Sequence, residues 1–294
     1  MSTMRRPMTL LATGTVLAAS LVALQIPLTH WVDSKPKLHQ LTYLPSGDYL
    51  RMASLGYREM VADVLWLQAI QVMGERKLSA EEGHWLYDAV DRITTLDPKF
   101  VRAYEAGSHA LCILVVMPEE SNRLLEKGIQ HNPLEWKLPF LLGINYYFEL
   151  ADDEKAAEAM AKAARLPGAP DGIARLAAKL FVSAKSPQQA VELLAKVYEE
   201  TSDENVRKAL EVRLKESLVE RDIQILEQVI SRYQAMYSRR PERLENVVEQ
   251  GLLQELPKEP FGGHYLYEPE TGAVRSSEVT ERMRITARRR GQYQ

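Results

Sequence analysis

The sequence predicts an all-α solenoid of stacked helical hairpins, preceded by a transmembrane helix and followed by a small β-hairpin. Three patterns support this prediction. Small and apolar residues recur about every 34 residues in the middle of the chain, an uncharged apolar run lies near its start, and alternating aromatic residues flank a turn near its end. These patterns divide the 294 residues into segments 1–33, 34–58, 59–203, 204–240, 241–277 and 278–294.

Segment 1–33 is expected to be a signal anchor that forms a single transmembrane helix. No charged residue occurs between Met8 and Ile26, and nineteen helical residues span about 28 Å, close to one hydrocarbon core of roughly 30 Å. The preceding pair of arginines would stay in the cytoplasm, and Trp31 would lie at the membrane interface. A cleaved signal peptide is the alternative, but the run is long for one and its small-residue cleavage sites are poor.

The residues after this run are expected to lie outside the cytoplasm. Because the arginine pair stays inside, the soluble domain would occupy the periplasmic side of a bacterial inner membrane, tethered through residues 8–31. Segment 34–58 is expected to be a linker that becomes structured, since a free tether would rarely carry residues such as Tyr43, Tyr49 and Met52. We expect these side chains to cap the first helices of the body.

The bulk composition excludes some classes of protein. The formal net charge is −3, whereas a general nucleic-acid binder normally carries a basic surplus, so no nucleic-acid partner is expected. The single cysteine, Cys112, can form no internal disulfide, and its apolar neighbours predict a buried thiol. His109 lies close by on the same predicted helix, but no further His or Cys is near, which favours a structural role over metal binding.

Segment 59–203 contains a repeat in which one small or apolar residue is followed by others four and seven positions later. The leading residues are Leu86, Ser121, Ala156 and Ala190, which are spaced by 35, 35 and 34 residues. Offsets of four and seven place side chains on one helix face, and turn residues after each stretch end the helix. A period of this length fits two short helices and two turns, so the segment predicts four helical hairpins.

One unit shows the pattern most completely. It consists of Leu142, Gly143, Tyr146, Ala156, Met160 and Ala163. On these residues, the stretch 60–203 resembles the tetratricopeptide repeat (TPR) family, with a related helical-hairpin array as the alternative. The resemblance implies a TPR-like solenoid of antiparallel helix pairs, whose concave surface is lined by the first helix of each pair.

That concave surface is the expected binding site for a protein partner. When the repeat is aligned with the TPR pattern, the lining of this surface combines polar side chains with a central apolar patch. This mixture is suited to holding a peptide segment. The expected lining residues are Gln68, Gln71, Glu75, Arg102, Glu105, His109, Lys137, Phe140, Ile144, Tyr147, Arg175 and Lys179.

The C-terminal third is expected to close the solenoid. Segment 204–240 lacks Pro and Gly and carries apolar residues at helical spacing, which predicts one long capping helix. In segment 241–277, a short helix is followed by alternating aromatic residues and a Pro-Glu-Thr-Gly turn, which predicts a β-hairpin. Segment 278–294 is rich in arginine and has no apolar periodicity, so it is expected to be a solvated basic tail.

Part of this region is similar to a second family. Its key residues are Leu256, Pro257, Pro260, Phe261, Gly262 and Gly263. On them, residues 237–277 resemble the C-terminal part of the major pseudopilin of type II secretion systems. The N-terminal methylation motif of that family is not found, and its calcium-binding loop cannot be matched, so no metal site is expected.

The sequence predicts a protein that is not an enzyme. The sequence has no nucleophile elbow, phosphate loop, dinucleotide fingerprint or zinc-type histidine spacing, so no cofactor is expected. Trp66, Trp85 and Trp136 are expected in the core. We therefore expect a non-enzymatic, membrane-anchored TPR scaffold or adaptor that binds a protein partner in a bacterial envelope assembly, related to a pilus, secretion or a transporter. The alternative is a pilin-like structural component of a secretion or pilus filament.

Overall fold

The computed structural model describes residues 20, 23, 44–74 and 78–283. The chain divides into two compact units, Met1–Pro45 and Ser46–Gln294. The expected membrane anchor and most of the linker lie outside the described residues. Within the described residues, no helix is both long enough and apolar enough to cross a bilayer.

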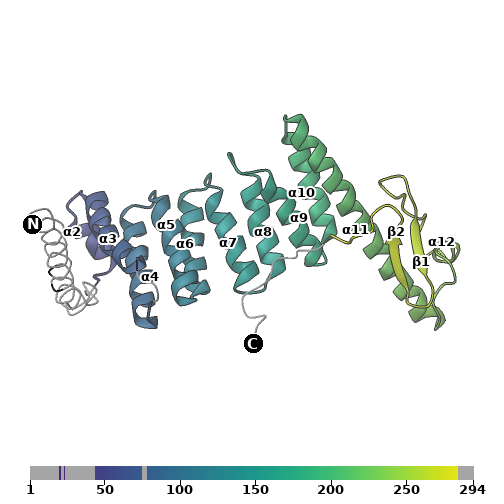
Figure 1. The fold of residues 1–294 in the computed structure, drawn as a ribbon, viewed down its shortest axis with the longest axis horizontal. Coiled ribbons are helices and arrows are strands. Elements are labelled where there is room, and N and C mark those ends of the chain that lie inside the picture. Colours follow the sequence, from purple (N-terminus) through teal and green to yellow (C-terminus); the bar gives the residue numbers. More distant parts are fainter. Residues whose placement is uncertain (1–19, 21–22, 24–43, 75–77, 284–294) are drawn as a thin grey trace, which may run out of the picture. The chain divides into compact units, whose positions relative to one another are not determined.

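The second unit is mostly helical and ends in a two-stranded antiparallel sheet, which confirms the predicted fold class at this level. Its elements, in chain order, are drawn in Figure 1. The first ten are α2 (Gly47–Ala53), α3 (Arg58–Met73), α4 (Ala80–Leu96), α5 (Val101–Ala110), the π-helical turn η1 (Leu111–Val115), α6 (Pro118–His131), α7 (Lys137–Phe148), α8 (Asp153–Ala164), α9 (Gly172–Ser183) and α10 (Pro187–Glu200). The last four are α11 (Glu204–Tyr237), α12 (Glu245–Glu249), β1 (Tyr265–Glu268) and β2 (Ala273–Ser276).

From α3 to α11, each helix packs against the next one in the chain (Figure 1). The pairs α3–α4, α5–α6, α7–α8 and α9–α10 fall where the four hairpins were expected. Helix α4 also contacts α6, and α5 also contacts α7, so successive pairs share one continuous core. Stacking of this kind buries apolar faces that a single hairpin would leave in water.

Local sequence explains where the helices begin. Ser79 and Glu82 form a capping box at α4: the Ser79 hydroxyl accepts from the Glu82 N–H at 3.2 Å, and Glu82 Oε2 accepts from the Ser79 N–H at 2.7 Å. Pro118 and Pro187 occupy the first turns of α6 and α10, where a missing N–H costs nothing. The Asp152 carboxylate caps α8 by accepting from the backbone N–H of Lys155.

Close packing within a hairpin depends on a glycine in the best-matching repeat unit. A Cβ atom at Gly143 would lie 2.6 Å from Met160 Cγ and 3.0 Å from the carbonyl oxygen of Ala156. Both distances are shorter than a normal carbon contact, so α7 and α8 can approach this closely only because Gly143 has no side chain. The presence of a glycine at position 143, opposite Ala156, thus has a direct steric cause.

Helix α11 covers α9 and α10 and then carries the C-terminal sheet. Strand β1 pairs with β2 so that Tyr265 faces Ser276 and Tyr267 faces Val274. The Tyr265 hydroxyl donates to the buried Asp222 carboxylate of α11 at 3.0 Å, which ties the hairpin to the helix. The predicted β-hairpin is confirmed, α11 covers most of the segment expected as one long helix, and α12 is a five-residue helix near the start of segment 241–277, where a short helix was expected.

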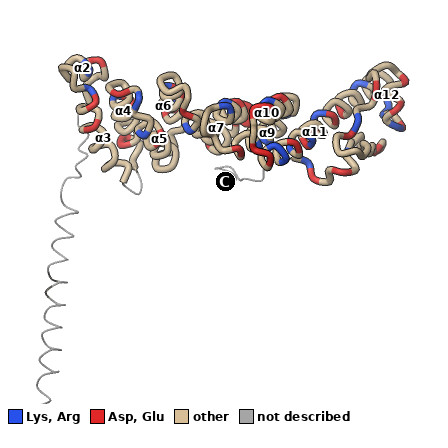
Figure 2. Tube along the Cα trace, turned by 90° about the horizontal axis from the view of Figure 1, so that it is seen from above, with Lys and Arg blue, Asp and Glu red and all other residues tan. Residues whose placement is uncertain are grey.

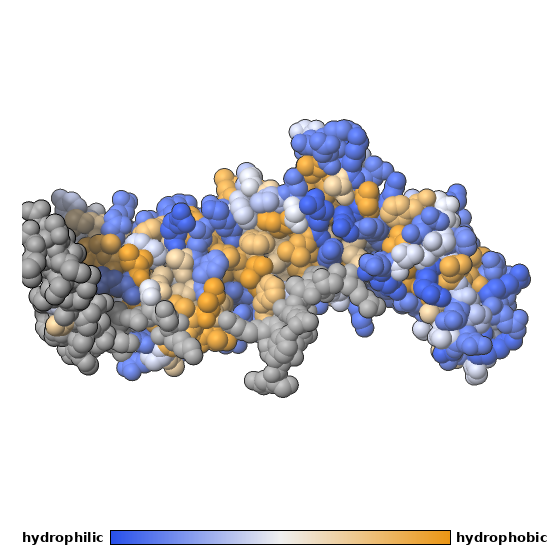
Figure 3. Space-filling model, viewed as in Figure 1, coloured by the Kyte–Doolittle hydropathy of each residue, from blue (hydrophilic) through white to orange (hydrophobic). Residues whose placement is uncertain are grey.

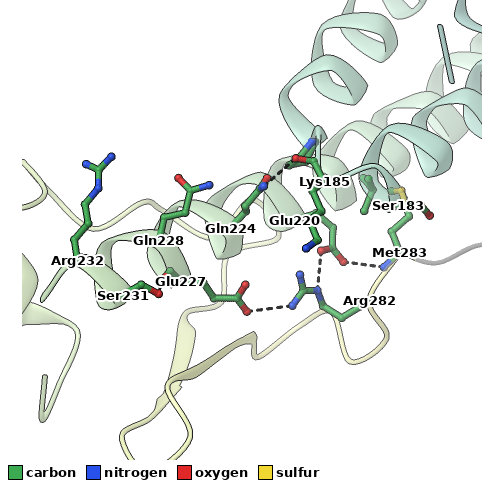
Figure 4. Close-up of a pocket in the computed structure, with 12 residues that line it drawn as sticks. Ser183, Lys185, Glu220, Gln224, Glu227, Gln228, Ser231, Arg232, Arg282 and Met283 are labelled. Carbon is green, nitrogen blue, oxygen red and sulfur yellow. Dashed lines mark hydrogen bonds and ion pairs between the residues drawn. The ribbon is translucent and has the colours of Figure 1, made fainter. Parts of the chain in front are cut away.

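The start of the basic tail is attached to the body although most of its described residues remain exposed, which refines the expectation for segment 278–294. Arg282 donates from Nε to Glu220 Oε2 at 2.7 Å, and the Met283 N–H donates to the other oxygen of the same buried carboxylate at 2.8 Å (Figure 4). A second ion pair joins Arg282 to Glu227 at 3.6 Å. The chain after β2 therefore returns along α11 as a strap, and residues 284–294 lie outside the described residues.

The segment before α3 also differs from expectation. Ser46 caps α2 by accepting from the Tyr49 N–H at 3.3 Å, and Leu50 packs against the core beside α4. Tyr49 and Met52 point to solvent instead of covering the first helices. Tyr43 lies outside the described residues.

Candidate functional site

An open groove lies where α3, α5, η1 and α7 meet, and its volume is about 680 Å³. Helix α3 contributes Met73, while α5, η1 and α7 contribute the remaining side chains. The lining residues are Met73, Arg102, Glu105, Ala106, His109, Ala110, Ile113, Leu114, Trp136, Lys137, Phe140 and Leu141. Since three helices and the π-helical turn converge here, the packing of the helices fixes the shape of the groove.

The floor of the groove is apolar. Ile113 is 61% exposed although it directly follows the buried Cys112, and Leu114 and Leu141 are partly exposed beside it. Trp136 and Phe140 lie one helical turn apart, with ring centroids separated by 6.0 Å. Figure 3 shows hydrophobic surface over the middle of the helical array, whereas the surface around α11 is mostly hydrophilic. Exposed apolar surface gathered in a concavity is typical of a ligand or protein interaction site.

Charged side chains form the rim of the groove. Lys137 Nζ lies 3.5 Å from Glu105 Oε1, and Arg102 Nη1 lies 3.9 Å from Glu105 Oε2. These contacts are ion pairs without a tight hydrogen bond, and Glu105 Oε1 accepts no hydrogen bond although it is buried. The His109 ring lies at the surface, and its Nδ1 is 2.9 Å from the Glu105 carbonyl oxygen. The rim therefore carries two cations against one carboxylate.

The exposed position of Ile113 results from the π-helical turn η1. Such turns insert an extra residue into a helix and frequently occur at functional sites. The turn ends at Val116, which adopts the left-handed conformation with φ 60° and ψ 54°. A β-branched residue rarely takes this conformation, which costs on the order of 1–3 kcal/mol. The Met117 N–H closes the turn by donating to the Leu111 carbonyl at 2.9 Å.

A buried polar network holds the rear of η1. Asn145 on α7 donates from Nδ2 to Ser121 Oγ at 2.8 Å and to Asn122 Oδ1 at 2.9 Å. Its Oδ1 accepts from Cys112 Sγ at 3.2 Å, and the hydroxyls of Ser108 and Ser121 lie 2.6 Å apart. All five side chains are buried. A buried network of this kind fixes the mutual placement of α5, α6 and α7, because a broken bond would leave a buried polar group unpaired.

The structure brings together five of the twelve predicted lining residues, namely Arg102, Glu105, His109, Lys137 and Phe140. It places the other residues elsewhere: Gln68 and Gln71 lie exposed on α3, Ile144 is half-buried on α7, Arg175 and Lys179 are half-buried on α9, and Glu75 lies outside the described residues.

Tyr147 was wrongly predicted to face the partner. Its side chain is buried in the core between α7 and α8, with its ring centroid 4.9 Å from that of Phe148. Helix α7 is apolar on all sides, so the sequence could not decide which aromatic residue points inward. The small side chains of α8, such as Ala156 and Ala157, make room for Tyr147.

The apolar floor of the groove was not predicted from the sequence. Trp136, expected in the core, is half-buried and lines the groove beside Phe140. Ile113, one of the apolar neighbours of Cys112, was not among the predicted lining residues. The signal for Ile113 lay in the seven consecutive apolar residues that begin at Leu111, because an unbroken run of this kind must expose part of itself when its helix packs on one face only.

A second hollow, of about 720 Å³, lies beside the returning strap. Both of its carboxylates are engaged, because Glu220 and Glu227 pair with Arg282, and the Gln224 amide donates to the Lys185 carbonyl at 2.9 Å (Figure 4). Along α11, acidic and basic residues alternate and do not form a surface of one sign (Figure 2). This hollow is therefore explained by the attachment of the strap.

The groove, by contrast, offers an apolar floor with a polar rim and no grouping of catalytic side chains among its lining residues. Such an arrangement suits the capture of apolar side chains from another molecule. No protein-family model matches the chain, and no curated protein matches it.

Proposed function

We propose that this protein is a membrane-anchored, TPR-type adaptor that binds a peptide segment of a protein partner in a bacterial envelope assembly. The anchor is residues 8–31, the soluble body faces the periplasm, and the binding site is the groove between α3, α5, η1 and α7. The observation that carries the proposal is the exposure of Ile113 in this groove, next to Trp136 and Phe140.

Three features support a peptide ligand. The groove opens to the surface, as binding of a segment from another molecule requires, and its volume of about 680 Å³ accommodates several side chains. Aromatic and apolar side chains on its floor are the residue types that dominate binding energy at protein interfaces. Arg102 and Lys137 supply a net positive rim, which would attract an acidic residue beside the apolar anchors.

The proposal is tested by placing a charge on the floor of the groove. In Ile113→Asp, a carboxylate enters the apolar contact surface, and we expect recovery of the partner from detergent-solubilised membranes to fall at least about tenfold. Leu134→Asp is the matched control, since Leu134 is 70% exposed on the α6–α7 connection and lies outside the groove. Equal recovery of the same partner with both variants would refute the proposal.

The alternative function, a pilin-like component of a filament, draws on one feature. The β-hairpin that packs on α11 lies within residues 237–277, the stretch whose sequence resembles the C-terminal part of a pseudopilin. A filament subunit would be processed at its N-terminus by a prepilin peptidase. Detection of an N-terminally processed and methylated chain in membranes would favour this alternative over the adaptor.

A further inference from the structure

The N-terminal end of the helical body exposes an unusual amount of apolar surface. Eight large apolar side chains of α2, α3 and their connection are between 40% and 85% exposed. They are Tyr49, Met52, Leu55, Tyr57, Met60, Val64, Leu67 and Ile70. We call this set the N-terminal apolar face. It is distinct from the groove, whose lining includes none of these residues.

Helix α3 exposes an apolar stripe on the side opposite its packed face. At 100° per residue, Met60, Val64 and Leu67 fall within about 60° of one another. Ala62 and Ala69, which are fully buried, lie on the opposite side. A surface helix of a soluble body normally carries polar residues there, so α3 is built to be covered on both sides.

The connection between α2 and α3 carries a second unusual residue. Leu55 is 85% exposed and adopts the left-handed conformation, with φ 49°. Glycine or asparagine would normally occupy such a position, because leucine is strained there and gains nothing from water. Strain that serves no packing within the body indicates a role outside it.

We propose that the N-terminal apolar face docks on the lipid bilayer that the same chain spans, with Leu55 and its neighbours at the tip of the contact. This inference rests on the proposed membrane anchor. Fourteen residues separate Trp31, at the expected membrane exit, from Ser46, where the body begins. Even fully extended, they reach at most about 50 Å, so the bilayer is always within range of this face.

The chemistry of the face favours lipid over a second copy of the chain. Tyrosines such as Tyr49 and Tyr57 combine an apolar ring with a polar tip and are typical of the membrane–water interface. The bilayer is held near by the tether at high effective concentration, whereas a second copy must first diffuse to the site. The tether therefore gives lipid an advantage that no separate molecule has.

The contact is apolar and not electrostatic. Between residues 46 and 64, the two cations Arg51 and Arg58 are opposed by the three acids Asp48, Glu59 and Asp63. Asp48 and Arg51 are already paired at 3.1 Å. A face of this composition has no strong attraction for anionic head groups, so docking should be insensitive to salt.

Depth-dependent quenching tests the inference in the full chain. A bimane fluorophore is attached to Leu55→Cys, and the chain is reconstituted in phosphatidylethanolamine–phosphatidylglycerol vesicles with or without doxyl lipid. We expect doxyl lipid to quench residue 55 at least about twofold, equally in low and high salt, and to leave a fluorophore at Leu134→Cys unquenched. Because Cys112 is buried, the wild-type chain should label weakly and serves as the labelling control.

A second set of variants keeps the test independent of labelling at residue 55. With the fluorophore on Val64→Cys, Leu55→Asp should reduce quenching by doxyl lipid about twofold, whereas Leu134→Asp should not. Absence of quenching at residue 55 would overturn the inference, as would thiol crosslinking of Leu55→Cys into a dimer without lipid quenching. Release of the chain from vesicles by alkaline carbonate would instead overturn the proposed anchor, which separates the two failures.

Discussion

The substitution Gly143→Ala tests the packing of the hairpins with a single added carbon atom. The new Cβ would lie 2.6 Å from Met160 Cγ and 3.0 Å from the Ala156 carbonyl oxygen. The Met160 side chain can move aside, but the carbonyl belongs to the backbone of α8, so relief requires the two helices to separate. Overpacking of this kind costs typically about 1–3 kcal/mol.

Helix propensity opposes this loss. Replacing a glycine by alanine inside a helix stabilises the folded state by about 1 kcal/mol. We therefore expect Gly143→Ala to lower the free energy of unfolding by up to about 2 kcal/mol, the difference between the steric cost and the propensity gain. Urea unfolding of the full chain in detergent, followed by far-ultraviolet circular dichroism, measures this difference.

Gly172→Ala is the matched control. Gly172 lies at the start of α9, and the nearest atom to an added Cβ is Arg175 Nη2 at 3.9 Å, an ordinary contact. Here only the propensity gain applies, so the variant should be as stable as the wild type or more stable. If Gly143→Ala proved no less stable than Gly172→Ala, the close approach of α7 and α8 would be wrong.

Three further outcomes follow from named contacts. Ser79→Ala removes the capping box with Glu82 and should cost about 1 kcal/mol, seen as faster hydrogen exchange in the first turn of α4. Arg282→Ala leaves the buried Glu220 without its cation and should cost about 1–3 kcal/mol, seen as faster proteolysis of the strap after β2. Burial raises the pKa of Tyr104 from 10.0 to about 12, so the unfolded chain loses this proton first and stability falls as the pH rises from about 10 to 12. Tyr104→Phe should weaken that alkaline loss in urea titrations, because it removes the titrating hydroxyl.

Local signals explain why most of the fold could be predicted. The hairpins depend on helix faces that recur every 34 or 35 residues. They also depend on helix-start residues such as Ser79 and Pro118, each of which acts on the few residues that follow it. The β-hairpin depends on a turn and on alternating side chains, which are equally local. The predictions hold because the tertiary packing of each hairpin favours the same helices and turns as the local sequence does.

The features that could not be predicted depend on distant contacts. The strap is attached through Arg282 and Glu220, which are 62 positions apart in the sequence. The sequence of this arginine-rich segment has no periodicity, so it predicted a free tail. The π-helical turn η1 lies against α4 at Gly83, where an added Cβ would meet Val115 Cγ1 at 2.6 Å. Nothing in the run from Leu111 to Val116 distinguishes this turn from a continued helix.

The candidate site was predicted only in outline, because the repeat is a local signal whereas the rest of the site depends on distant contacts. The repeat phase located the first helices, and this was sufficient for residues such as Arg102 and Lys137, which project from the exposed side of α5 and α7. It failed for Tyr147, where the choice between inside and outside depended on the small residues of α8. It also missed Ile113, whose exposure arises from η1 and not from the repeat.

Site-specific photocrosslinking at the floor of the groove tests the central claim most directly. With a benzophenone side chain at residue 113, irradiation of intact membranes should give one discrete protein adduct, and the charge reversal Lys137→Glu should weaken it about tenfold. The same side chain at residue 134 should give no such adduct. Equal crosslinking at both positions, or an adduct at residue 113 that ignores the charge of residue 137, would contradict the assignment of the groove as the site that holds the partner.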